Sequence, residues 1–268
     1  MKAINNYTAK DLTLVITAYK ECPYLEECIQ SVLKQTSVPN LMISTSTPND
    51  YISGLAEKYS LQVRVNPTGG QVKDYNFAMH QPDTPLVMLM HQDEVIAPAF
   101  VEQSIYELNH CKDPIISFTN YIEMHNDVVD KKASSIVKIK RIMLWPLSIP
   151  GVMRHGHGKR AIQLLGNPIT HPTVICVMKK MPEELFVERF KASMDWDLWE
   201  RLSRLKGSFV YSKKVLLYHR MNDDNQTSKL FKTTNSRYEE ESEIFNRFWP
   251  KWITKLIMKF YSKAANYY

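Results

Sequence analysis

The sequence predicts an α/β fold in which a mostly parallel, Rossmann-like sheet is flanked by helices and an amphipathic helix extends from its C-terminal end. Three observations predict it. The chain has 268 residues, of which 44% are hydrophobic, enough for a substantial core in one large domain or two small ones. Short β-rich apolar segments alternate with helical segments over residues 12–90, as in strands joined by helical crossovers. Near the end of the chain, lysines recur every fourth residue beside an apolar stripe.

The first strand and helix are marked by a change in the period of the hydrophobic residues. The run LTLVITA at residues 12–18 is β-rich and is followed by polar residues, so it is predicted to be a buried strand. In CPYLEECIQSVLKQT, Pro23 suits a first helical turn, and Glu26 and Glu27 favour the positive end of a helix. Apolar residues then recur at helical spacing as far as Leu33, which predicts a helix.

The same alternation continues along the chain. It predicts strands at 41–45, 61–65 and 86–90 and helices at 50–59 and 71–81. Such a sheet binds its ligands beyond the carboxyl ends of the strands. The segment HQDE, which directly follows the last of these strands, is therefore expected at the binding rim.

HQDE, residues 91–94, offers ligands for a divalent cation. His91 and Asp93 occupy alternate positions after a strand, so their side chains are expected to project to the same side. Hard cations that hold phosphates often take one or two protein carboxylates together with phosphate oxygens. The alternative is a polar turn in which Glu94 is solvated.

Composition excludes several classes of protein. Lys and Arg outnumber Asp and Glu by 34 to 28, a modest net charge of +6 that is unevenly distributed. The four cysteines form no C-x-x-C pair and no signal peptide precedes MKAINNYTAKD, so we expect reduced thiols in a cytoplasmic protein. No apolar run approaches the roughly 20 residues of a membrane span, so membrane contact is expected to be peripheral. The basic residues accompany no nucleic-acid-binding motif, and no nucleic acid partner is expected.

Four segments, taken in order, resemble the nucleotide-sugar glycosyltransferases of family 2, which have the GT-A fold. LVITAYKECPYLEECIQSVLKQT resembles their opening strand and helix, and NPTGGQVKDYNFAM resembles their glycine-rich turn and the helix after it. HQDE stands in place of their D-x-D metal motif, and MDWDLWERLSRLKGSFVYSKKVLLYHRMNDDNQTS resembles their catalytic acidic helix, next strand and Y-x-R segment. The resemblance covers most of residues 12 to about 230. It implies a GT-A type sheet and a nucleotide-sugar donor, most often a UDP-sugar.

The resemblance places donor contacts after the first two strands. Thr17, Tyr19 and Glu21 stand where the family contacts the nucleobase and ribose, although Tyr19 could simply cap the edge of the sheet. After the second strand the family has an acidic DDGS-type segment, whereas this chain has ISTS, which puts Ser44 in that place. A hydroxyl can still bond a base, but this departure leaves the nucleotide undetermined.

The metal motif and the following helix complete the implied donor site. Asp93 matches the second acid of D-x-D, which holds a Mn or Mg ion, and His91 replaces the first aspartate as a ligand. Gln92 lies between them and is assigned to the donor site. Lys73 and Asn76, which follow the glycine turn, are expected to line the same rim.

The remaining implied roles lie in the second half. Asp195 aligns with the general base that takes a proton from the acceptor hydroxyl, although Asp195 could instead cap its helix. Arg220 is expected on the donor diphosphate; the alternative is a solvated surface arginine. Asn167 and His171 are expected to meet the acceptor.

Two functions from different classes remain. The first is an inverting glycosyltransferase that adds a sugar to a hydroxyl of a cell-surface glycan or lipid-linked precursor. The second is a catalytically impaired, glycosyltransferase-like subunit that binds nucleotide or glycan, suggested by the altered ISTS and HQDE segments. The catalytic domain is expected at 1–235, with a nucleotide-sugar-binding half at 1–110 and an acceptor-binding half at 111–235. A C-terminal helical extension is expected at 236–268.

Two basic segments suggest a membrane. Residues 131–160 hold eight Lys or Arg and no acid, which suits an anionic or lipid-linked acceptor at a membrane surface; the alternative is a loop whose Trp145 packs on the domain. The sequence HGHGKR is expected to form a glycine turn. In the last segment, four lysines (Lys251, Lys255, Lys259 and Lys263) flank an apolar stripe formed by Trp252, Ile253, Leu256, Ile257, Phe260 and Tyr261. This helix either lies in an anionic lipid interface at the inner face of the plasma membrane or docks on the domain.

Overall fold

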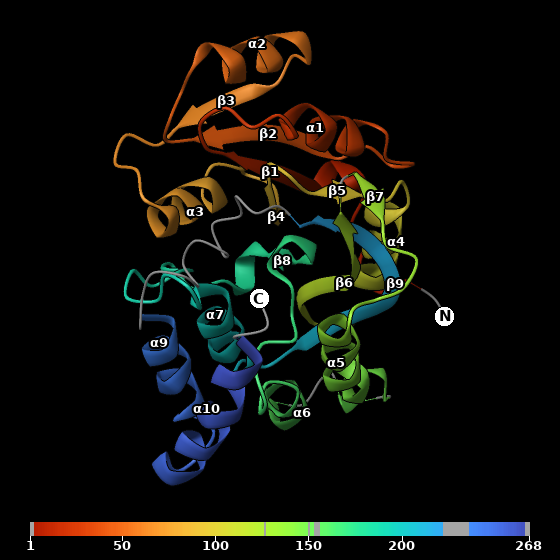
Figure 1. Cartoon of the computed structure of the whole chain (residues 1–268). Coiled ribbons are helices and arrows are strands. Elements are labelled where there is room, and N and C mark those ends of the chain that lie inside the picture. Colours follow the sequence, from red (N-terminus) through yellow and green to blue (C-terminus); the bar gives the residue numbers. More distant parts are fainter. Residues whose placement is uncertain (1–2, 126, 150, 153–155, 222–235, 266–268) are drawn as a thin grey trace.

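The computed structural model describes residues 3–125, 127–149, 151–152, 156–221 and 236–265 (Figure 1). The strands are β1 (Leu12–Ala18), β2 (Asn40–Thr45), β3 (Gln62–Val65), β4 (Leu86–His91), β5 (Val95–Ile96), β6 (Pro114–His125), β7 (Val128–Val129), β8 (Ile175–Val177) and β9 (Ser208–Arg220). The α-helices are α1 (Leu25–Leu33), α2 (Asp50–Lys58), α3 (Gln71–Met79), α4 (Phe100–Asn109), α5 (Ser135–Leu144), α6 (Gly156–Ala161), α7 (Met194–Ser203), α9 (Ser236–Phe245) and α10 (Lys251–Ala265). The 3-10 helices are η1 (Ala9–Asp11), η2 (Trp145–Ser148), η4 (His171–Thr173) and η5 (Met178–Lys180).

One sheet runs through the molecule in the order β3-β2-β1-β4-β8-β6-β9-β5, with β7 paired to β6. The strands of the first half are parallel: β1 lies between β2 and β4, and β3 lies beyond β2. β8 enters antiparallel between β4 and β6, and β9 runs parallel to β6. Helices cover both sides of this curled sheet (Figure 1), which confirms the predicted α/β class.

The strand and helix pattern predicted for residues 12–90 is confirmed. β1 is apolar on both faces because its residues alternate between two cores: Val15 packs into one, and Leu14 and Ile16 pack into the other. The turn before α3 depends on two glycines, Gly69 and Gly70, whose φ angles are +63° and +100°. These left-handed angles explain why the sequence has TGG there.

The two cores lie on opposite faces of the sheet. One contains residues of α1, α2 and α4, and the other contains residues of α3, α7, α9 and α10. Phe245 of α9 and Met258 of α10 belong to the second core, in which Phe245 meets Trp196 of α7 at a ring distance of 4.9 Å. The C-terminal helices therefore share a core with α7. The predicted division of the chain at residue 235 stays a prediction.

The basic segment differs from the loop that was one of its two predicted alternatives, and its role at a membrane surface stays a prediction. It forms α5 and η2, and the Trp145 side chain is exposed instead of packed on the domain. HGHGKR contributes to a helix, α6, not to a glycine turn, because buried Lys159 donates hydrogen bonds to the carbonyls of Leu205 (2.5 Å) and Gly207 (2.8 Å). These bonds attach α6 to the segment between α7 and β9. His155 lies outside the described residues.

The predicted C-terminal helix is confirmed as α10. Its most buried residues, Thr254 and Met258, lie outside the predicted stripe. Within the stripe, Ile253 and Ile257 are half-buried, whereas Trp252 and Leu256 face solvent. The side chains of Phe260, Tyr261 and Lys263 lie outside the described part of the structure. Among the described residues, no helix has both the length and the apolar character required to cross a bilayer.

Candidate functional site at the carboxyl ends of the strands

Three neighbouring strands bring predicted residues side by side. Thr17 of β1 is in register with Ser44 of β2 and with His91 of β4. Parallel strands end at the same edge of a sheet, so these side chains and the segments that follow them form one rim. Ser44 is buried, Thr17 and His91 are half-buried, and Glu21, beyond the strand, is exposed.

His91, Asp93 and Glu94 form a cluster at this rim. One potential ligand atom from each lies within 4.8 Å of the others. His91 Nε2 and Glu94 Oε2 are buried without a hydrogen-bond partner among the described residues. An imidazole nitrogen and two carboxylates can bind Mn²⁺ or Mg²⁺, with phosphate oxygens completing the coordination. The residues present therefore fit a divalent cation.

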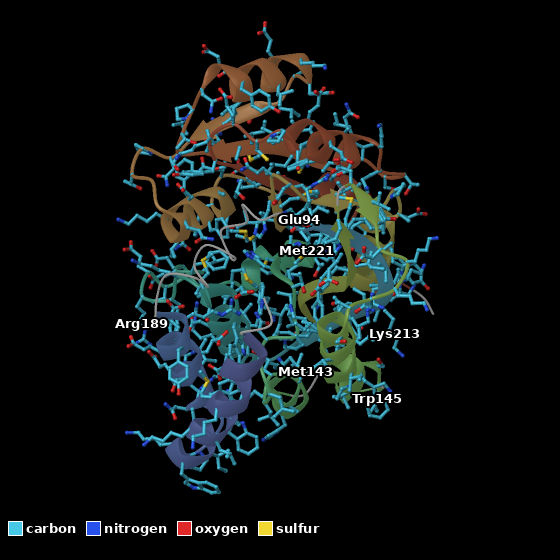
Figure 2. All side chains as sticks on the ribbon, viewed as in Figure 1. Glu94, Met143, Trp145, Arg189, Lys213 and Met221 are labelled. Atoms are coloured by element: carbon cyan, nitrogen blue, oxygen red, sulfur yellow. The ribbon has the colours of Figure 1, made fainter. Side chains whose placement is uncertain are left out.

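Glu94 is buried, so the alternative of a solvated glutamate is wrong. Its side chain is 1% exposed, and its Oε1 lies 2.7 Å from His219 Nδ1 and 3.7 Å from His91 Nδ1. Burial opposes ionisation of Glu94, but the charge and hydrogen bond of His219 outweigh it and lower the pKa of the glutamate. Although burial opposes protonation of His219, the charge of Glu94 raises the pKa of that histidine. The buried Glu94 and the half-buried His219 therefore form an ion pair at the rim (Figure 2 labels Glu94).

Arg220 supports the cluster from the end of β9. It is buried, so the solvated alternative is wrong; its Nε donates to the backbone carbonyl of Asp93 at 3.2 Å. Its guanidinium also pairs with Glu27 and Asp127 and lies 4.0 Å from the centroid of the Tyr24 ring. Contact between Arg220 and a diphosphate stays a prediction. In this structure Arg220 holds the loop that carries Asp93.

The segment after β1 is attached to the metal loop by Gln92. The Gln92 amide accepts a hydrogen bond from Tyr19 N (2.8 Å) and donates one to Tyr19 O (3.1 Å). The Tyr19 ring remains exposed to solvent, where a nucleobase could stack on it. Donor contacts by Thr17, Tyr19, Glu21 and Ser44 stay predictions.

Helix α3 connects the rim to the second half. Asn76 donates to Phe186 O (2.6 Å) and accepts from Phe186 N (2.9 Å), so its amide joins two segments of the chain. Exposed Lys73 lies 3.6 Å from Glu188 of the same segment. These contacts give Asn76 a structural role that its helical position did not suggest, and donor binding by Lys73 and Asn76 stays a prediction.

A group of aromatic rings extends from the metal cluster to α7. Tyr75 lies 5.8 Å from His91 and 5.5 Å from His171, and His171 lies 5.9 Å from Trp199 of α7. Burial raises the pKa of Tyr75, and the charges of both Asp93 and Asp195 raise it further. Burial lowers the pKa of His171 to about 3, so this ring is neutral at physiological pH.

Asp195 lies in the first turn of α7, partly exposed. Its Oδ2 accepts a hydrogen bond from Asn167 Nδ2 at 2.9 Å, and its Oδ1 accepts from Trp196 N at 2.7 Å. Burial raises the pKa of Asp195 even though these two bonds favour the charged form. A carboxylate with a raised pKa is a stronger base. The bond to Trp196 N also satisfies a free amide of the first turn, so the capping and base roles can coexist.

Glu240 of α9 holds the chain just before α7 in place. Its Oε1 accepts a hydrogen bond from Lys191 N (3.0 Å), and its Oε2 accepts from Ala192 N (2.8 Å) and Ser193 N (2.9 Å). The carboxylate is buried and therefore fixes the start of the helix that carries Asp195. Sequence reasoning missed Glu240 and the partnership of Glu94 with His219. The approach of His219 to Glu94 follows from the pairing of β5 with β9, which no local pattern indicates.

The chain matches known proteins over most of its length. The family description "Glycosyl transferase family 2" matches residues 13–165. A protein of Rickettsia felis named as an uncharacterized glycosyltransferase is 22% identical over 244 residues, which cover 87% of this chain and 37% of that protein. The chain thus spans well under half the length of this relative.

Solved structures share the fold. The structure of S. aureus TarS 1–349 in complex with UDP-GlcNAc is similar with a TM-score of 0.63 and 15% identity, covering 92% of this chain and 70% of that one. A mannosyltransferase from Pyrobaculum calidifontis in complex with GDP-Man and Mn²⁺ is similar with a TM-score of 0.56 and 12% identity, covering 90% of this chain and 64% of that one. These likenesses confirm the expected GT-A type of fold.

Proposed function

Since the chain belongs to glycosyltransferase family 2, we propose that it moves a sugar from a nucleotide-diphosphate donor to a hydroxyl group of an acceptor, with inversion at the anomeric carbon. One observation carries the proposal: contacts between aromatic rings connect the cation cluster to the helix that carries Asp195. Asp93 belongs with His91 to the cluster that can bind a cation, the His91 ring lies 5.7 Å from that of His171, and His171 lies 5.9 Å from Trp199 of α7, the helix of Asp195. A leaving-group site and a base thus share one rim.

The reaction needs one base and no covalent intermediate. Asp195 takes the proton of the acceptor hydroxyl while the oxygen of that hydroxyl bonds to the anomeric carbon. The bond from the anomeric carbon to the diphosphate oxygen breaks in the same step. Asn167 orients Asp195 through the 2.9 Å hydrogen bond. A single displacement of this kind inverts the anomeric configuration.

His91, Asp93 and Glu94 are the residues that would hold a Mn or Mg ion. Such a cation would neutralise charge on the departing diphosphate. Arg220 and the ion pair of Glu94 and His219 keep the Asp93 loop in position. The TarS structure is a complex with UDP-GlcNAc and the mannosyltransferase structure a complex with GDP-Man and Mn²⁺, which supports a nucleotide-sugar donor; we propose a UDP-sugar.

The proposed acceptor is a cell-surface glycan or lipid-linked precursor, with Asn167 and His171 on its side of the rim. The basic segment at 131–160 supports an anionic or lipid-linked acceptor, since it contains no acid. The protein would then act in the cytoplasm, peripherally at the inner face of the plasma membrane.

The alternative is a subunit that binds nucleotide or glycan without turnover. Ser44, near the end of β2 where the family has an acidic residue, favours it, and the pairing of Asp195 with Asn167 favours the enzyme. The two differ in whether bound donor is consumed.

The variant Asp195→Asn tests the mechanism. It preserves side-chain size, so donor affinity by calorimetry should stay within about twofold, while release of UDP with acceptor should fall about 10²–10⁴-fold. Asp83→Asn, an exposed aspartate before β4, is the matched control and should behave as wild type. Near wild-type turnover of Asp195→Asn, or a product of retained configuration, would show that Asp195 is not the base. Donor binding without UDP release by the wild-type protein, with any acceptor offered, would favour the non-catalytic subunit.

A further inference from the structure

Helix α5 and the 3-10 helix η2 leave an apolar ridge uncovered. Ile142 and Trp145 are 72% and 61% exposed, and Ile139, one turn earlier, is also exposed. At about 100° per residue, these three positions and exposed Lys138 lie on one face. Isolated exposed apolar residues are ordinary, but a contiguous row that includes tryptophan marks an interaction surface.

The charge around this ridge is mainly positive. Residues 131–160 contain no acid, and Lys131, Lys132 and Lys138 are exposed. Beyond η2, a hollow of about 370 Å³ is lined by Leu147, Ser148, Lys213 and Lys214 among others; Glu107, the one acid that lines it, comes from α4. Figure 2 shows Trp145 and Lys213 on the same side of the molecule.

The outer face of α10 has the same composition. Trp252 is 69% exposed and Leu256 is exposed, flanked by the exposed lysines Lys251, Lys255 and Lys259. The opposite face of this helix already packs on the core through Thr254 and Met258. Docking of α10 therefore leaves a second apolar and basic face in solvent.

The helices that carry the two faces lie in the same half of the molecule, α10 on one side of α6 and α5 on the other. Figure 1 places α5, α6 and α10 at the end opposite α2 and β3. We propose that the α5–η2 ridge and the outer face of α10 form a single docking surface for an anionic lipid bilayer. Tryptophan and isoleucine enter the interface between headgroups and acyl chains, and the lysines contact the headgroups.

Charge decides between a bilayer and a second copy of this chain. A symmetric dimer through this surface would bring lysines against lysines, because such an interface uses the same patch on both copies. An anionic bilayer complements every one of these charges and accepts the exposed apolar side chains. The inference rests on the peripheral membrane location proposed above and names the surface that would contact the bilayer. It requires no transfer activity.

Co-sedimentation with vesicles tests the surface. The full chain is mixed with vesicles of phosphatidylcholine alone or with about one third phosphatidylglycerol, at low and high salt. The wild-type protein should bind the anionic vesicles only, and binding should weaken at high salt. Ile142→Ser/Trp145→Ser and Trp252→Ser/Leu256→Ser should each reduce partitioning about tenfold or more, since each removes two membrane-inserting side chains.

A matched control distinguishes the surface from exposed apolar residues in general. Val38→Ser/Val65→Ser removes two exposed aliphatic side chains from β3 and from the segment before β2, away from this surface, and should bind as wild type. Unchanged binding of either test variant, or loss of binding by the control, would overturn the single surface. The proposal would also be overturned if the wild-type protein were a dimer that bound no vesicles and both test variants were monomers. A failed transfer assay leaves these results unaffected, so the two proposals fail separately.

Discussion

Replacing Glu240 by glutamine tests whether α9 sets the position of the helix that carries Asp195. The carboxylate accepts three backbone hydrogen bonds, from Lys191, Ala192 and Ser193, at 2.8–3.0 Å. Glutamine keeps the shape, but it has one acceptor oxygen and a donor amide. The oxygen can serve the two amides that share Oε2, and the NH₂ group would then face the Lys191 N–H.

The cost follows from these contacts. Losing one charge-assisted hydrogen bond in a buried site costs about 1.5–3 kcal/mol. The other two change from a charged to a neutral acceptor, which costs about 1 kcal/mol each because charge-assisted bonds are roughly twice as strong. The expected loss in the free energy of unfolding is about 4 kcal/mol, less than the stability of a typical domain, so the variant should still fold.

Urea unfolding followed by circular dichroism measures the stability, and UDP release beside donor affinity measures the consequence for the site. Under conditions in which the variant is folded, we expect turnover to fall while donor affinity stays within about twofold, since Glu240 contacts only the start of α7. Glu239→Gln, an exposed neighbour on α9, is the matched control. If Glu240→Gln were as stable as the control, the three hydrogen bonds of Glu240 would not stabilise the start of α7. If the variant were destabilised but turned over donor normally, Glu240 would not set the position of Asp195.

Two further predictions concern the rim. Asp93→Ala should abolish the manganese-dependent part of UDP binding, measured by calorimetry, without unfolding the protein, because its side chain lies at the end of a strand; unchanged affinity in manganese would remove Asp93 from the metal site. His171 has a pKa of about 3 in the folded state and about 6.5 in the unfolded chain. The free energy of unfolding should therefore decrease as the pH falls below about 6.5, because the unfolded chain then binds a proton that the folded chain does not. Between pH 7.5 and 5.5 the wild type should therefore lose about 1.4 kcal/mol more than His171→Phe in urea unfolding, and equal losses would contradict the buried neutral ring.

The sequence was most informative where local patterns decide the structure. Each strand and helix predicted for residues 12–90 is present, because the hydrophobic period and the glycine turn before α3 act within a few residues. The rim followed as well, since adjacent parallel strands must end together.

Contacts between distant segments could not be read in the same way. Glu94 resembled a solvated turn residue because His219, its partner, is far along the chain and is brought close by strand pairing. The glycines of HGHGKR suggested a turn, but the buried bonds of Lys159 stabilise a helix. Nothing in the composition of α9 indicated that Glu240, one of several glutamates there, turns inward.

The late entry of β8 has a consequence for synthesis of the chain. β4 has an apolar edge that β8 covers by pairing Leu86, Met88 and the residue between them with Ile175–Val177. On the ribosome, β4 emerges long before β8, and at about 5–20 residues per second this edge stays open for several seconds. An open apolar strand edge is a template for pairing with other chains. The nascent protein should therefore depend on chaperones during this interval, and slow translation between β4 and β8 should increase aggregation more than slow translation after β8.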